Sequence, residues 1–402
     1  MIEGRDFICF CNDWEGDPLS KQQIITRLAR ANRVLWINST GTRNPTVSVY
    51  DAKRAWKKIR KFLKGCRKVA ENISVFSPLV IPFHGNPLAQ RINRRLLAWG
   101  VRRECRKLGF EDPITLSFVP TSAAIAGSLG ESAVIYYCVD EYSEFTGTDK
   151  AAMLEMERRL MKRSDLVIVS ASRLYETKHP HNANTHLITH GVDVDHFRKA
   201  CLDATPLPEN RPIGSGPTIG FFGLIGDWVD LALIGQLASA RPSWNFVLIG
   251  DLVSDGSAVK KLPNVHLLGR LPYASLPGYC KTFDVAILPF VLNELTLAAN
   301  PLKLREYVAA GLPVVATPLP EVRKLERYVR LATTGSEYLN HIEQILSEGE
   351  TGPRMYRSRW MESQSWDAKV EELSGHIANI GQARASAAQA TAAHATGAPQ
   401  VA

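Results

Sequence analysis

The sequence predicts two α/β domains, each built around a parallel β-sheet, and three observations carry this prediction. The chain has 402 residues, which is enough for two domains with separate cores. Apolar runs of strand length alternate with helical stretches, as in parallel sheets that helices cover on both faces. This alternation begins again after residues 199–216, a segment rich in Pro, Gly and Asn that we interpret as a linker between the domains.

The expected strands are continuous apolar runs. Those of the first domain are Asp6–Cys11, Arg33–Asn38, Ile114–Phe118, Ala133–Val139 and Asp165–Ala171. Those of the second domain are Thr218–Gly223, Asn245–Asp251, Val265–Gly269, Asp284–Phe290 and Leu312–Pro318. We expect the first domain over residues 1–198, the second over 217–360, and a last helix over 361–380. Residues 381–402 are nearly all small or polar and have no apolar stripe, so a disordered tail is expected there.

Composition and charge narrow the classes of partner. The net charge of +8 indicates an anionic partner, which can be a nucleic acid, an anionic lipid or a phosphorylated small molecule. The seven cysteines follow no repeated spacing and no Cys/His quartet has zinc-finger spacing, so neither a disulfide framework nor a metal site is expected. This cysteine usage leads us to expect a reducing cytoplasm. No window reaches the apolar length of a membrane helix, and the N-terminus lacks a signal-peptide core.

The stretch NPLKLREYVAAGLPVVATP in the second half predicts a capped helix followed by a strand. Asn300 is expected as the N-cap, Pro301 as the first helical residue and Gly311 as the left-handed residue after the end. Lys303 and Glu306 lie three positions apart and therefore share a helix face. Such a helix start suits a phosphate, because free N–H groups and the helix dipole attract anions. A surface ion pair is the alternative.

Two loops of the second domain are expected at the same edge of its sheet. GFFGLIGDW places Gly223 and Gly226 at a strand-to-helix turn, where glycines let the backbone approach a ligand. Asp227 is expected near the start of the following helix. Arg270 and Tyr273 lie on the loop after the third strand. A purely structural turn is the alternative for the glycines, because their spacing differs from the dinucleotide fingerprint.

Five segments together resemble one enzyme family. They are HGVDVDHF, FFGLIGDW, VHLLGRLPYASLP, FDVAILPF and NPLKLREYVAAGLPVV, in this order along the chain. The ordered set resembles the group 1 glycosyltransferases, which have the two-Rossmann-domain fold called GT-B. The resemblance implies an α/β protein of two Rossmann-like domains whose parallel sheets face a central cleft. It also implies that the last helix, over residues 361–380, can cross back to the first domain.

The resemblance further implies a site for a nucleotide-sugar donor. In this family the helix equivalent to the one that begins at Asn300, Pro301 and Leu302 lies under the donor diphosphate. Its glutamate, here Glu306, binds the ribose hydroxyls, and Lys303 is positioned to stabilise the departing nucleotide. The other implied donor residues lie on the turn and the loop after the third strand: Gly223, Gly226, Asp227, Arg270 and Tyr273. No metal and no cofactor is required if a lysine, an arginine and a helix terminus supply the positive charge.

The sequence departs from the family at one position. Many group 1 enzymes carry two glutamates eight positions apart, and the first contacts the donor sugar, whereas Ala298 stands at that position here. The motif Asn-Pro-x-Lys-x-x-Glu-Tyr resembles a subset that acts in exopolysaccharide and cell-envelope assembly, some members of which invert the anomeric centre. Retention and inversion therefore both stay open.

The first domain is expected to hold the acceptor. YYCVDEYSEF puts Asp140 directly after an apolar strand, with Glu141 behind it. In an inverting enzyme Asp140 would be the base that takes the proton of the acceptor hydroxyl, and Glu141 is a further catalytic candidate. The alternative is that Asp140 only caps the next helix. Asp13, Trp14 and Lys21 follow the first strand and are expected to contact the acceptor.

A basic run, Lys53–Lys68, is interleaved with apolar residues at helical spacing. A helix here would be basic and amphipathic, which is typical of contact with an anionic membrane surface. A second basic stretch, Arg91–Lys107, contains Leu96, Leu97 and Trp99. The alternative is a solvated charged face that packs one apolar stripe inward. We expect membrane contact through Lys53–Lys68, since a lipid-linked acceptor would require it.

The sequence therefore predicts a cytoplasmic, peripherally membrane-bound glycosyltransferase. It would move a sugar from a UDP- or GDP-linked donor to a glycan or lipid-linked acceptor in polysaccharide or cell-envelope synthesis, without a metal. Three alternatives stay open: a non-catalytic relative, a nucleotide-sugar epimerase of the same fold, and a nucleic-acid-binding protein, although no standard nucleic-acid-binding signature is present.

Overall fold

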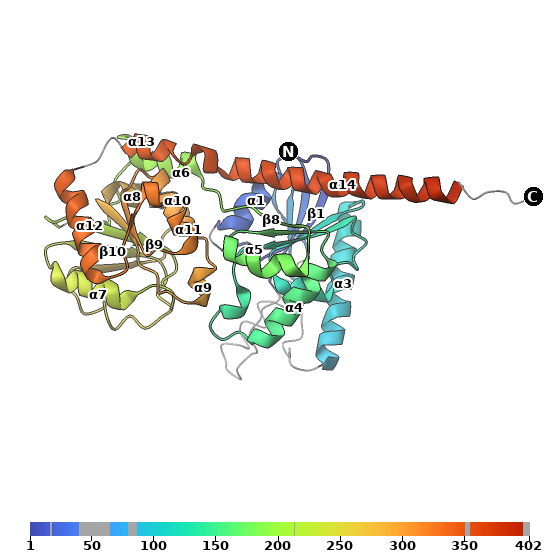
Figure 1. Cartoon of the computed structure of the whole chain (residues 1–402), viewed down its shortest axis with the longest axis horizontal. Helices are drawn as coiled ribbons and strands as arrows, with labels where there is room; N and C mark the ends of the chain where they lie inside the picture. The colour runs from blue at the N-terminus through green and yellow to red at the C-terminus, as the bar shows by residue number, and fades with distance from the viewer. Residues whose placement is uncertain (17, 40–64, 79–86, 213, 350–353, 397–402) are drawn as a thin grey trace, which may run out of the picture. The chain divides into compact units, whose positions relative to one another are not determined.

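The structure is a computed structural model of the chain and describes residues 1–16, 18–39, 65–78, 87–212, 214–349 and 354–396 (Figure 1). The chain forms two compact units, each with its own sheet. Unit 1 consists of Met1–Ser170, Leu174–Ile188 and Lys369–Ala402. Unit 2 consists of Ala171–Arg173 and Thr189–Ala368. The prediction of two α/β domains is confirmed.

Unit 1 is built around an eight-stranded sheet with the order β3-β4-β2-β1-β5-β6-β7-β8. Its strands are β1 (Asp6–Phe10), β2 (Arg33–Ile37), β3 (Arg67–Ala70), β4 (Ile73–Phe76), β5 (Ile114–Ser117), β6 (Ala133–Cys138), β7 (Leu166–Val169) and β8 (Thr185–Leu187). All neighbours pair in parallel except β3 and β4. The five expected apolar runs became β1, β2, β5, β6 and β7. The other three strands were not predicted: β3 is a charged edge strand and β8 has only three residues, whereas β4 is a short apolar run, ISVF, that was missed.

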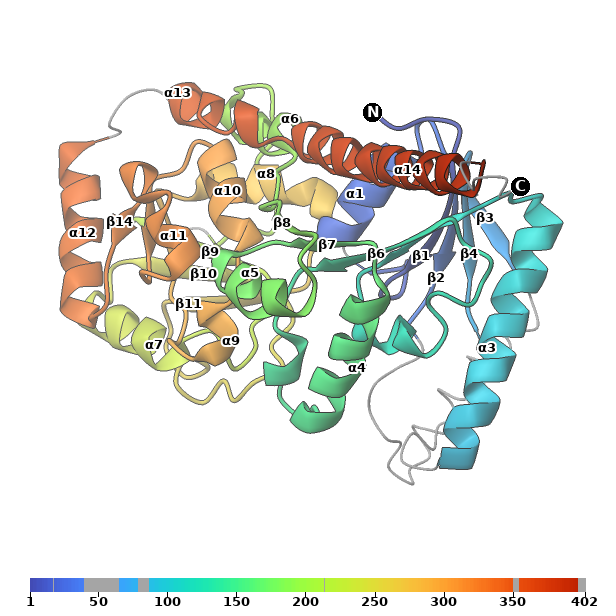
Figure 2. The same cartoon turned by 45° about the vertical axis from the view of Figure 1, so that its right-hand side comes forward.

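Helices cover the sheet of unit 1. They are α1 (Ser20–Leu28), α3 (Pro87–Leu108), α4 (Lys150–Arg163), α5 (Ser172–Lys178), whose first two residues belong to unit 2, and α14 (Trp366–Thr396). Short 3₁₀ turns occur at Pro120–Ala124, Tyr142–Glu144 and His179–His181. Helix α3 packs Leu97 and Val101 into one core cluster with Ile8 and Leu35 of the sheet. Figure 2 shows α14 beside α1, as does Figure 1.

Unit 2 is built around a six-stranded parallel sheet with the order β11-β10-β9-β12-β13-β14. Its strands are β9 (Thr218–Phe222), β10 (Asn245–Ile249), β11 (Val265–Gly269), β12 (Val285–Leu288), β13 (Val314–Ala316) and β14 (Arg330–Leu331). The first five correspond to the runs expected from the sequence. The carboxyl ends of these strands lie at one edge of the sheet, where ligands bind in open α/β structures.

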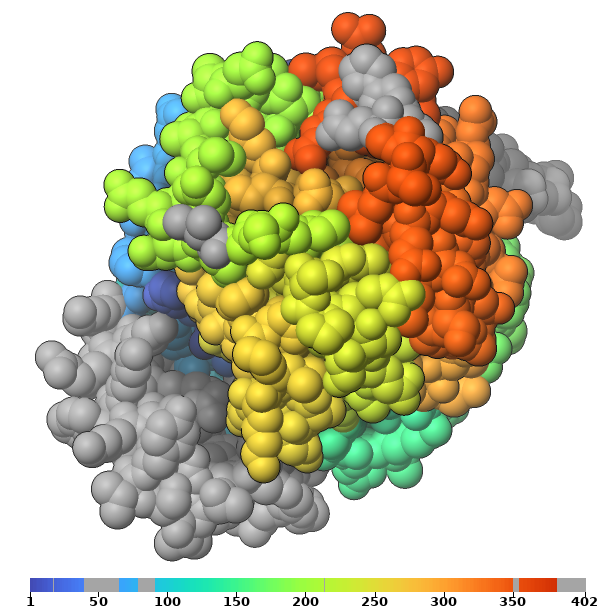
Figure 3. All heavy atoms as spheres, turned by 90° about the vertical axis from the view of Figure 1, so that its left-hand side faces the viewer, coloured from blue at the N-terminus to red at the C-terminus, as the bar shows by residue number. Residues whose placement is uncertain are grey.

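The helices of unit 2 are α6 (Val194–Arg198), α7 (Leu231–Ala240), α8 (Leu276–Thr282), α9 (Glu294–Leu297), α10 (Leu302–Ala309), α11 (Pro320–Arg323), α12 (Gly335–Glu348) and α13 (Arg354–Arg359). Short 3₁₀ turns occur at Lys199–Cys201, Tyr273–Ser275, Glu326–Tyr328 and Glu362–Gln364. Helices α7 (yellow-green) and α12 (orange-red) lie side by side on the face of unit 2 that Figure 3 shows. A hydrogen bond of 2.7 Å from Arg241 Nε to Glu343 Oε1 joins them.

The units divide at a different place from the one expected. The change falls between Ile188 and Thr189, not at residue 198, and residues 199–216 belong to unit 2 rather than forming a linker. Ala200, inside the expected linker, is buried in the core of unit 2 next to Phe197, so this part of the segment is not a flexible linker. Lys281 Nζ donates to three carbonyl oxygens of the expected linker, each at 2.9 Å, from Leu202, Asp203 and Thr205. Burial and these hydrogen bonds hold the first part of the expected linker on unit 2, and composition does not reveal either of them.

The end of the chain also differs from the prediction. Helix α14 belongs to unit 1 from Lys369 onward and continues to Thr396, so the expected disordered tail is helical up to that residue. Alanine has the highest intrinsic helix propensity, and it dominates residues 382–396, so a helix that is already started can propagate through them. Disorder was predicted because these residues lack an apolar stripe, and their high helix propensity was given too little weight.

Candidate active site

The floor of the site in unit 2 is made of glycines at neighbouring strand ends. Gly223 follows β9 with φ of +134°, and Gly250 follows β10 with φ of +143°. A Cβ at position 250 would lie 1.9 Å from the Gly223 carbonyl oxygen, so the two main chains touch. The sequence pointed to Gly223 but not to Gly250, although NFVLIGD shows the same glycine at a strand end.

Lys303 lies directly against this floor. A Cβ at Gly223 would lie 2.1 Å from Lys303 Cε and 3.0 Å from Lys303 Nζ, so the lysine fills the space that a side chain would need. Helix α10 therefore brings its first-turn ammonium group to the backbone of the β9 turn. The glycine turn and the lysine, predicted separately, are brought together by the fold.

Glu306 lies one turn further along α10 and is half-buried. Burial raises the pKa of its carboxyl to about 7, Lys303 acts in the opposite direction, and Asp193 adds to the rise. Asp193 is the N-cap of α6, where its Oδ1 accepts from the His196 backbone N–H at 3.3 Å. Asp193 lies in the segment HGVDVDHF but was not among the predicted site residues.

The start of α10 differs in detail from the prediction. The helix begins at Leu302, and Pro301, with φ of −65° and ψ of 113°, is the N-cap residue instead of the first helical one. Asn300 is not the N-cap, because its side-chain oxygen accepts from Arg305 Nη1 at 2.6 Å. Arg305 is almost fully buried and needs such an acceptor. Gly311 has φ of +75°, as expected for the residue that ends the helix.

The remaining donor candidates fall into two groups. Asp227 and Arg270 are exposed, and Asp227 lies outside α7, whose N-cap is Asp230. Gly226 and Tyr273 are held by packing. A Cβ at Gly226 would lie 2.6 Å from the Trp228 ring, and the Tyr273 ring stacks on His196 at 4.1 Å.

In unit 1 the loops after β1 and β6 bring two predicted residues together. Lys21, on α1, is buried, and its Nζ donates to Asn12 Oδ1 at 3.1 Å and lies 5.5 Å from the centre of the Tyr142 ring. Burial lowers the pKa of Lys21, while the nearby carboxylate of Asp140 acts in the opposite direction. The acceptor candidate Lys21 and the base candidate Asp140 are therefore electrostatic neighbours.

Glu141 takes part in a buried ion network and not in an open site. Lys178 Nζ donates to Glu141 Oε2 at 2.7 Å and to Glu157 Oε2 at 2.8 Å. Tyr136 and Ser143 donate further bonds, to Glu157 Oε1 at 2.7 Å and to Glu141 Oε1 at 2.9 Å. Burial lowers the pKa of Lys178, but the charges around it raise it overall. Glu141 thus fixes the loop after β6, which leaves Asp140 as the better base candidate.

The alternative role of Asp140 as a helix cap is wrong. Asp149 is the N-cap of α4, and its Oδ1 accepts from the Ala152 backbone N–H at 3.0 Å. The short turn before it has no side-chain cap. On the loop after β1, Asp13 is exposed, while the Trp14 ring packs edge-on against Trp36 at 5.0 Å.

The structure does not test the predicted membrane contact through Lys53–Lys68. Most of the basic run Lys53–Lys68 lies outside the described residues, and only its end forms β3. Among the helices that the structure describes, none combines the length and the apolar character needed to cross a bilayer.

Comparison with known proteins gives one family match and a shared fold. Residues 216–348 match the family described as glycosyl transferases group 1. The fold is GT-B, because solved GT-B enzymes match almost the whole chain. A sucrose-phosphate synthase from Thermosynechococcus elongatus matches 94% of this chain and 100% of its own, with a TM-score of 0.67 and 14% identity.

Two further solved structures match nearly as well. HepE of Anabaena in complex with UDP-glucose has a TM-score of 0.63 and 14% identity over 93% of this chain and 99% of its own. A trehalose-6-phosphate structure from E. coli bound with UDP-2-fluoro glucose has a TM-score of 0.65 and 12% identity over 94% and 99%. At these identities the likeness establishes the fold alone.

One curated protein is similar in sequence. TuaH of Bacillus subtilis (strain 168), named for a glycosyltransferase role in teichuronic acid biosynthesis, is 27% identical over 265 residues. The match covers 60% of this chain and 65% of TuaH.

Proposed function

We propose that the protein moves a sugar from a nucleoside-diphosphate donor to a glycan or lipid-linked acceptor in cell-envelope polysaccharide synthesis. One observation carries the proposal: Lys303 lies against the glycine turn of Gly223, one helical turn from the half-buried Glu306. A cation, an open backbone and a carboxylate at one sheet edge suit a diphosphate and a ribose. The UDP-sugars in the HepE and trehalose-6-phosphate structures make UDP the first choice and GDP the second.

The donor chemistry follows from the charges. As the bond between the anomeric carbon and the diphosphate breaks, negative charge grows on the leaving oxygen. The ammonium of Lys303 and the N–H groups at the start of α10 would stabilise that charge more than the ground state. The ionised carboxylate of Glu306 would accept hydrogen bonds from the two ribose hydroxyls. This arrangement needs no metal, so we propose a metal-independent reaction.

Asp140 is the proposed base if the reaction inverts the anomeric carbon. It follows β6 and is an electrostatic neighbour of Lys21. The Lys178 network holds the loop on which Asp140 lies. Asp13 and Trp14, on the loop after β1, are the proposed acceptor contacts.

The acceptor is proposed to be presented at the cytoplasmic surface of a membrane. TuaH is named for the synthesis of a cell-envelope polymer, and the run Lys53–Lys68 has the charge and apolar spacing of a membrane-contacting segment. Together these two observations favour a lipid-linked acceptor over a small soluble one.

Calorimetric titration with UDP and GDP tests the donor site. We expect wild type and Glu326→Ala to bind one nucleotide at micromolar Kd, because Glu326 is an exposed glutamate of the same unit, and Glu306→Ala to bind it at least about tenfold more weakly. Equal binding by Glu306→Ala would remove Glu306 from the site. Absence of binding by folded wild type would favour the alternative that the protein is a non-catalytic relative. That alternative was considered because Ala298 stands in place of the family glutamate.

The same titration against pH checks the role of the carboxyl group. UDP-glucose serves as the ligand because its diphosphate does not titrate in this range. With a Glu306 pKa of about 7, the carboxylate becomes the main form above that pH, so wild-type affinity should rise from pH ~6 to pH ~8. Glu306→Gln should show little change over the same range. A wild-type curve as flat as that of Glu306→Gln would contradict the ribose role.

A further inference from the structure

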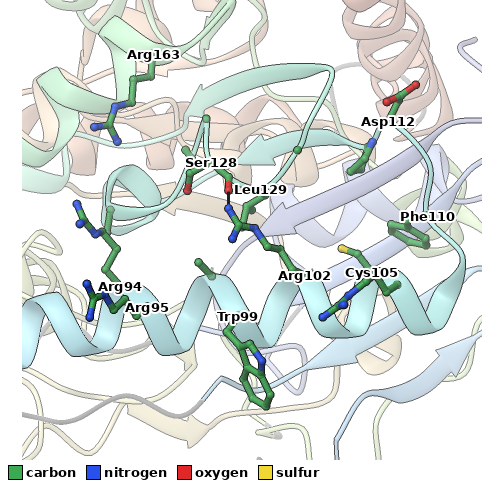
Figure 4. Close-up of a pocket in the computed structure, with 17 residues that line it drawn as sticks. Arg94, Arg95, Trp99, Arg102, Cys105, Phe110, Asp112, Ser128, Leu129 and Arg163 are labelled. Atoms are coloured by element: carbon green, nitrogen blue, oxygen red, sulfur yellow. Dashed lines mark hydrogen bonds between the residues drawn. The ribbon is translucent and has the colours of Figure 1, made fainter.

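Unit 1 contains a large cavity that the proposed reaction does not use. Its volume is about 1170 Å³, and its walls are helix α3 on one side and, on the other, the segments around Phe110–Pro113 and Ala124–Gly130 (Figure 4). The segments 110–113 and 127–130 precede β5 and β6, whereas Asp140 follows β6 at the opposite edge of the sheet. The cavity therefore shares no lining residue with the site of Lys21 and Asp140.

The lining of the cavity is strongly basic. It contains five arginines and one carboxylate, that of Asp112. The arginines are Arg94, Arg95, Arg102, Arg106 and Arg163. Within the described part of the chain, no carboxylate forms an ion pair with any of the five. Such a concentration of uncompensated guanidinium groups is unfavourable unless an anion is close, and the guanidinium fork matches phosphate oxygens.

Two of these arginines are fixed to the cavity wall and three remain available. Arg102 donates to the Ser128 carbonyl (Figure 4). Arg163 Nη1 donates to the Ala123 carbonyl at 2.6 Å. Arg94, Arg95 and Arg106 are exposed, and their side chains form no hydrogen bond with another described residue. The cavity thus combines a preorganised wall with three guanidinium groups that can turn toward a ligand.

An exposed apolar stripe runs along the same helix. Ile92, Leu96 and Trp99 are 38%, 41% and 51% exposed, and their spacing of four and three residues puts them on one face of α3. The guanidinium of Arg103 lies 5.5 Å from the centre of the Trp99 ring. A basic helix with exposed aliphatic and indole side chains is typical of a helix that lies in the headgroup region of a membrane.

We propose that this face of unit 1 binds an anionic phospholipid bilayer. Headgroup phosphates enter the arginine cavity, and Ile92, Leu96 and Trp99 insert at the boundary between headgroups and acyl chains. A soluble phosphate alone would explain the arginines but not the apolar stripe beside them, which is why the bilayer is the favoured source of the anion. The inference rests on the proposed function for its partner, a membrane that carries the acceptor, but it uses a separate site.

Vesicle sedimentation of the full chain tests the arginine cavity. Vesicles of phosphatidylcholine mixed with phosphatidylglycerol should bind wild type, and vesicles of phosphatidylcholine alone should bind it weakly. Arg94→Gln/Arg95→Gln/Arg106→Gln should partition about a hundredfold more weakly into the anionic vesicles. The control Arg158→Gln/Arg159→Gln/Lys162→Gln removes the same charge from exposed positions on α4 and should lose less than tenfold.

A pair of leucine variants tests the apolar stripe. Leu96 on α3 and Leu154 on α4 are 41% and 43% exposed. Leu96→Ser should weaken partitioning about tenfold, because a side chain that inserts into the bilayer is lost, while Leu154→Ser should leave it unchanged. Equal behaviour of the two variants would overturn the insertion of the stripe.

Other outcomes overturn the proposal in distinguishable ways. Equal loss in the two triple variants would mean a non-specific charge effect. Tight calorimetric binding of inorganic pyrophosphate without vesicle binding would identify a soluble anion, and binding of an oligonucleotide in its place would identify a nucleic-acid surface. Dimer formation abolished by the arginine triple variant would identify a second copy of the chain. The arginine variants should keep wild-type affinity for UDP, so failure here leaves the donor site untouched.

Discussion

The two units hold their candidate site residues at the same kind of sheet edge but by different means. In unit 1, buried charges fix the loop after β6, through Lys178 between Glu141 and Glu157. In unit 2, main-chain contacts between Gly223 and Gly250 leave an open floor against which Lys303 lies. The first arrangement depends on charges far apart in sequence, and the second on the absence of side chains. The two edges should therefore fail under different substitutions.

The largest effect is expected at the proposed base. Asp140→Asn should slow sugar transfer by roughly 10²–10⁴-fold, because the amide cannot accept the acceptor proton, while UDP affinity stays at the wild-type value. UDP release from the donor, with a lipid-linked sugar as acceptor, measures the rate. Glu144→Gln is the matched control, since Glu144 lies on the same loop and pairs with Lys150 at 2.5 Å. Near-normal transfer by Asp140→Asn would end the base assignment.

The next effect tests the buried network of unit 1. Lys178→Met should lower the free energy of unfolding of unit 1 by about 3 kcal/mol, because it leaves Glu157, which is 1% exposed, without a counter-charge. Hydrogen exchange of β6 and α4 measures this locally. Lys150→Met breaks an exposed pair and should cost less than about 1 kcal/mol. Equal losses of unfolding free energy in the two variants would mean that the buried network contributes no more than a surface ion pair. Buried charges would then not be what fixes the loop of unit 1.

The smallest effect sharpens the comparison from the side of unit 2. Gly223→Ala should weaken UDP binding by about 2 kcal/mol, because the new methyl group displaces Lys303 and the positive φ strains the backbone. Gly349→Ala separates these causes, since Gly349 has φ of +69° but an open surrounding. It should lower stability by about 1 kcal/mol and leave binding intact. Calorimetry and thermal unfolding on both variants decide whether displacement of Lys303 matters.

The sequence predicted those features whose cause lies close to them along the chain. The five predicted strands of each unit are apolar runs, and Gly223 and Gly311 mark positions where the backbone needs positive φ. Lys303 and Glu306 were found because one helix turn relates them. The fold class could be predicted in the same way, because the alternation of apolar strands with helices is a local pattern that repeats along the chain.

Features that depend on contacts between residues far apart along the chain could not be predicted from the sequence. Glu157 and Glu141 lie 21 and 37 residues from Lys178, and nothing in the spacing pairs them. Asp193 reaches the site only because α6 and α10 belong to one packed unit. The linker was wrongly predicted because Ala200 is held by burial in the core of unit 2, whereas the composition of residues 199–216 suggested a linker.

The return of the chain to unit 1 at Lys369 has a consequence for biosynthesis. Val370, Leu373 and Ile377 on α14 are buried, and the His376 ring packs against the His186 ring with 4.1 Å between the ring centres. During translation, the ribosome must therefore release all of unit 2 before the amino-terminal half can be completed. Unit 2 can finish folding first, although it is synthesised second. Until α14 is made, the apolar surface of unit 1 that it covers stays exposed, and a chaperone could bind there.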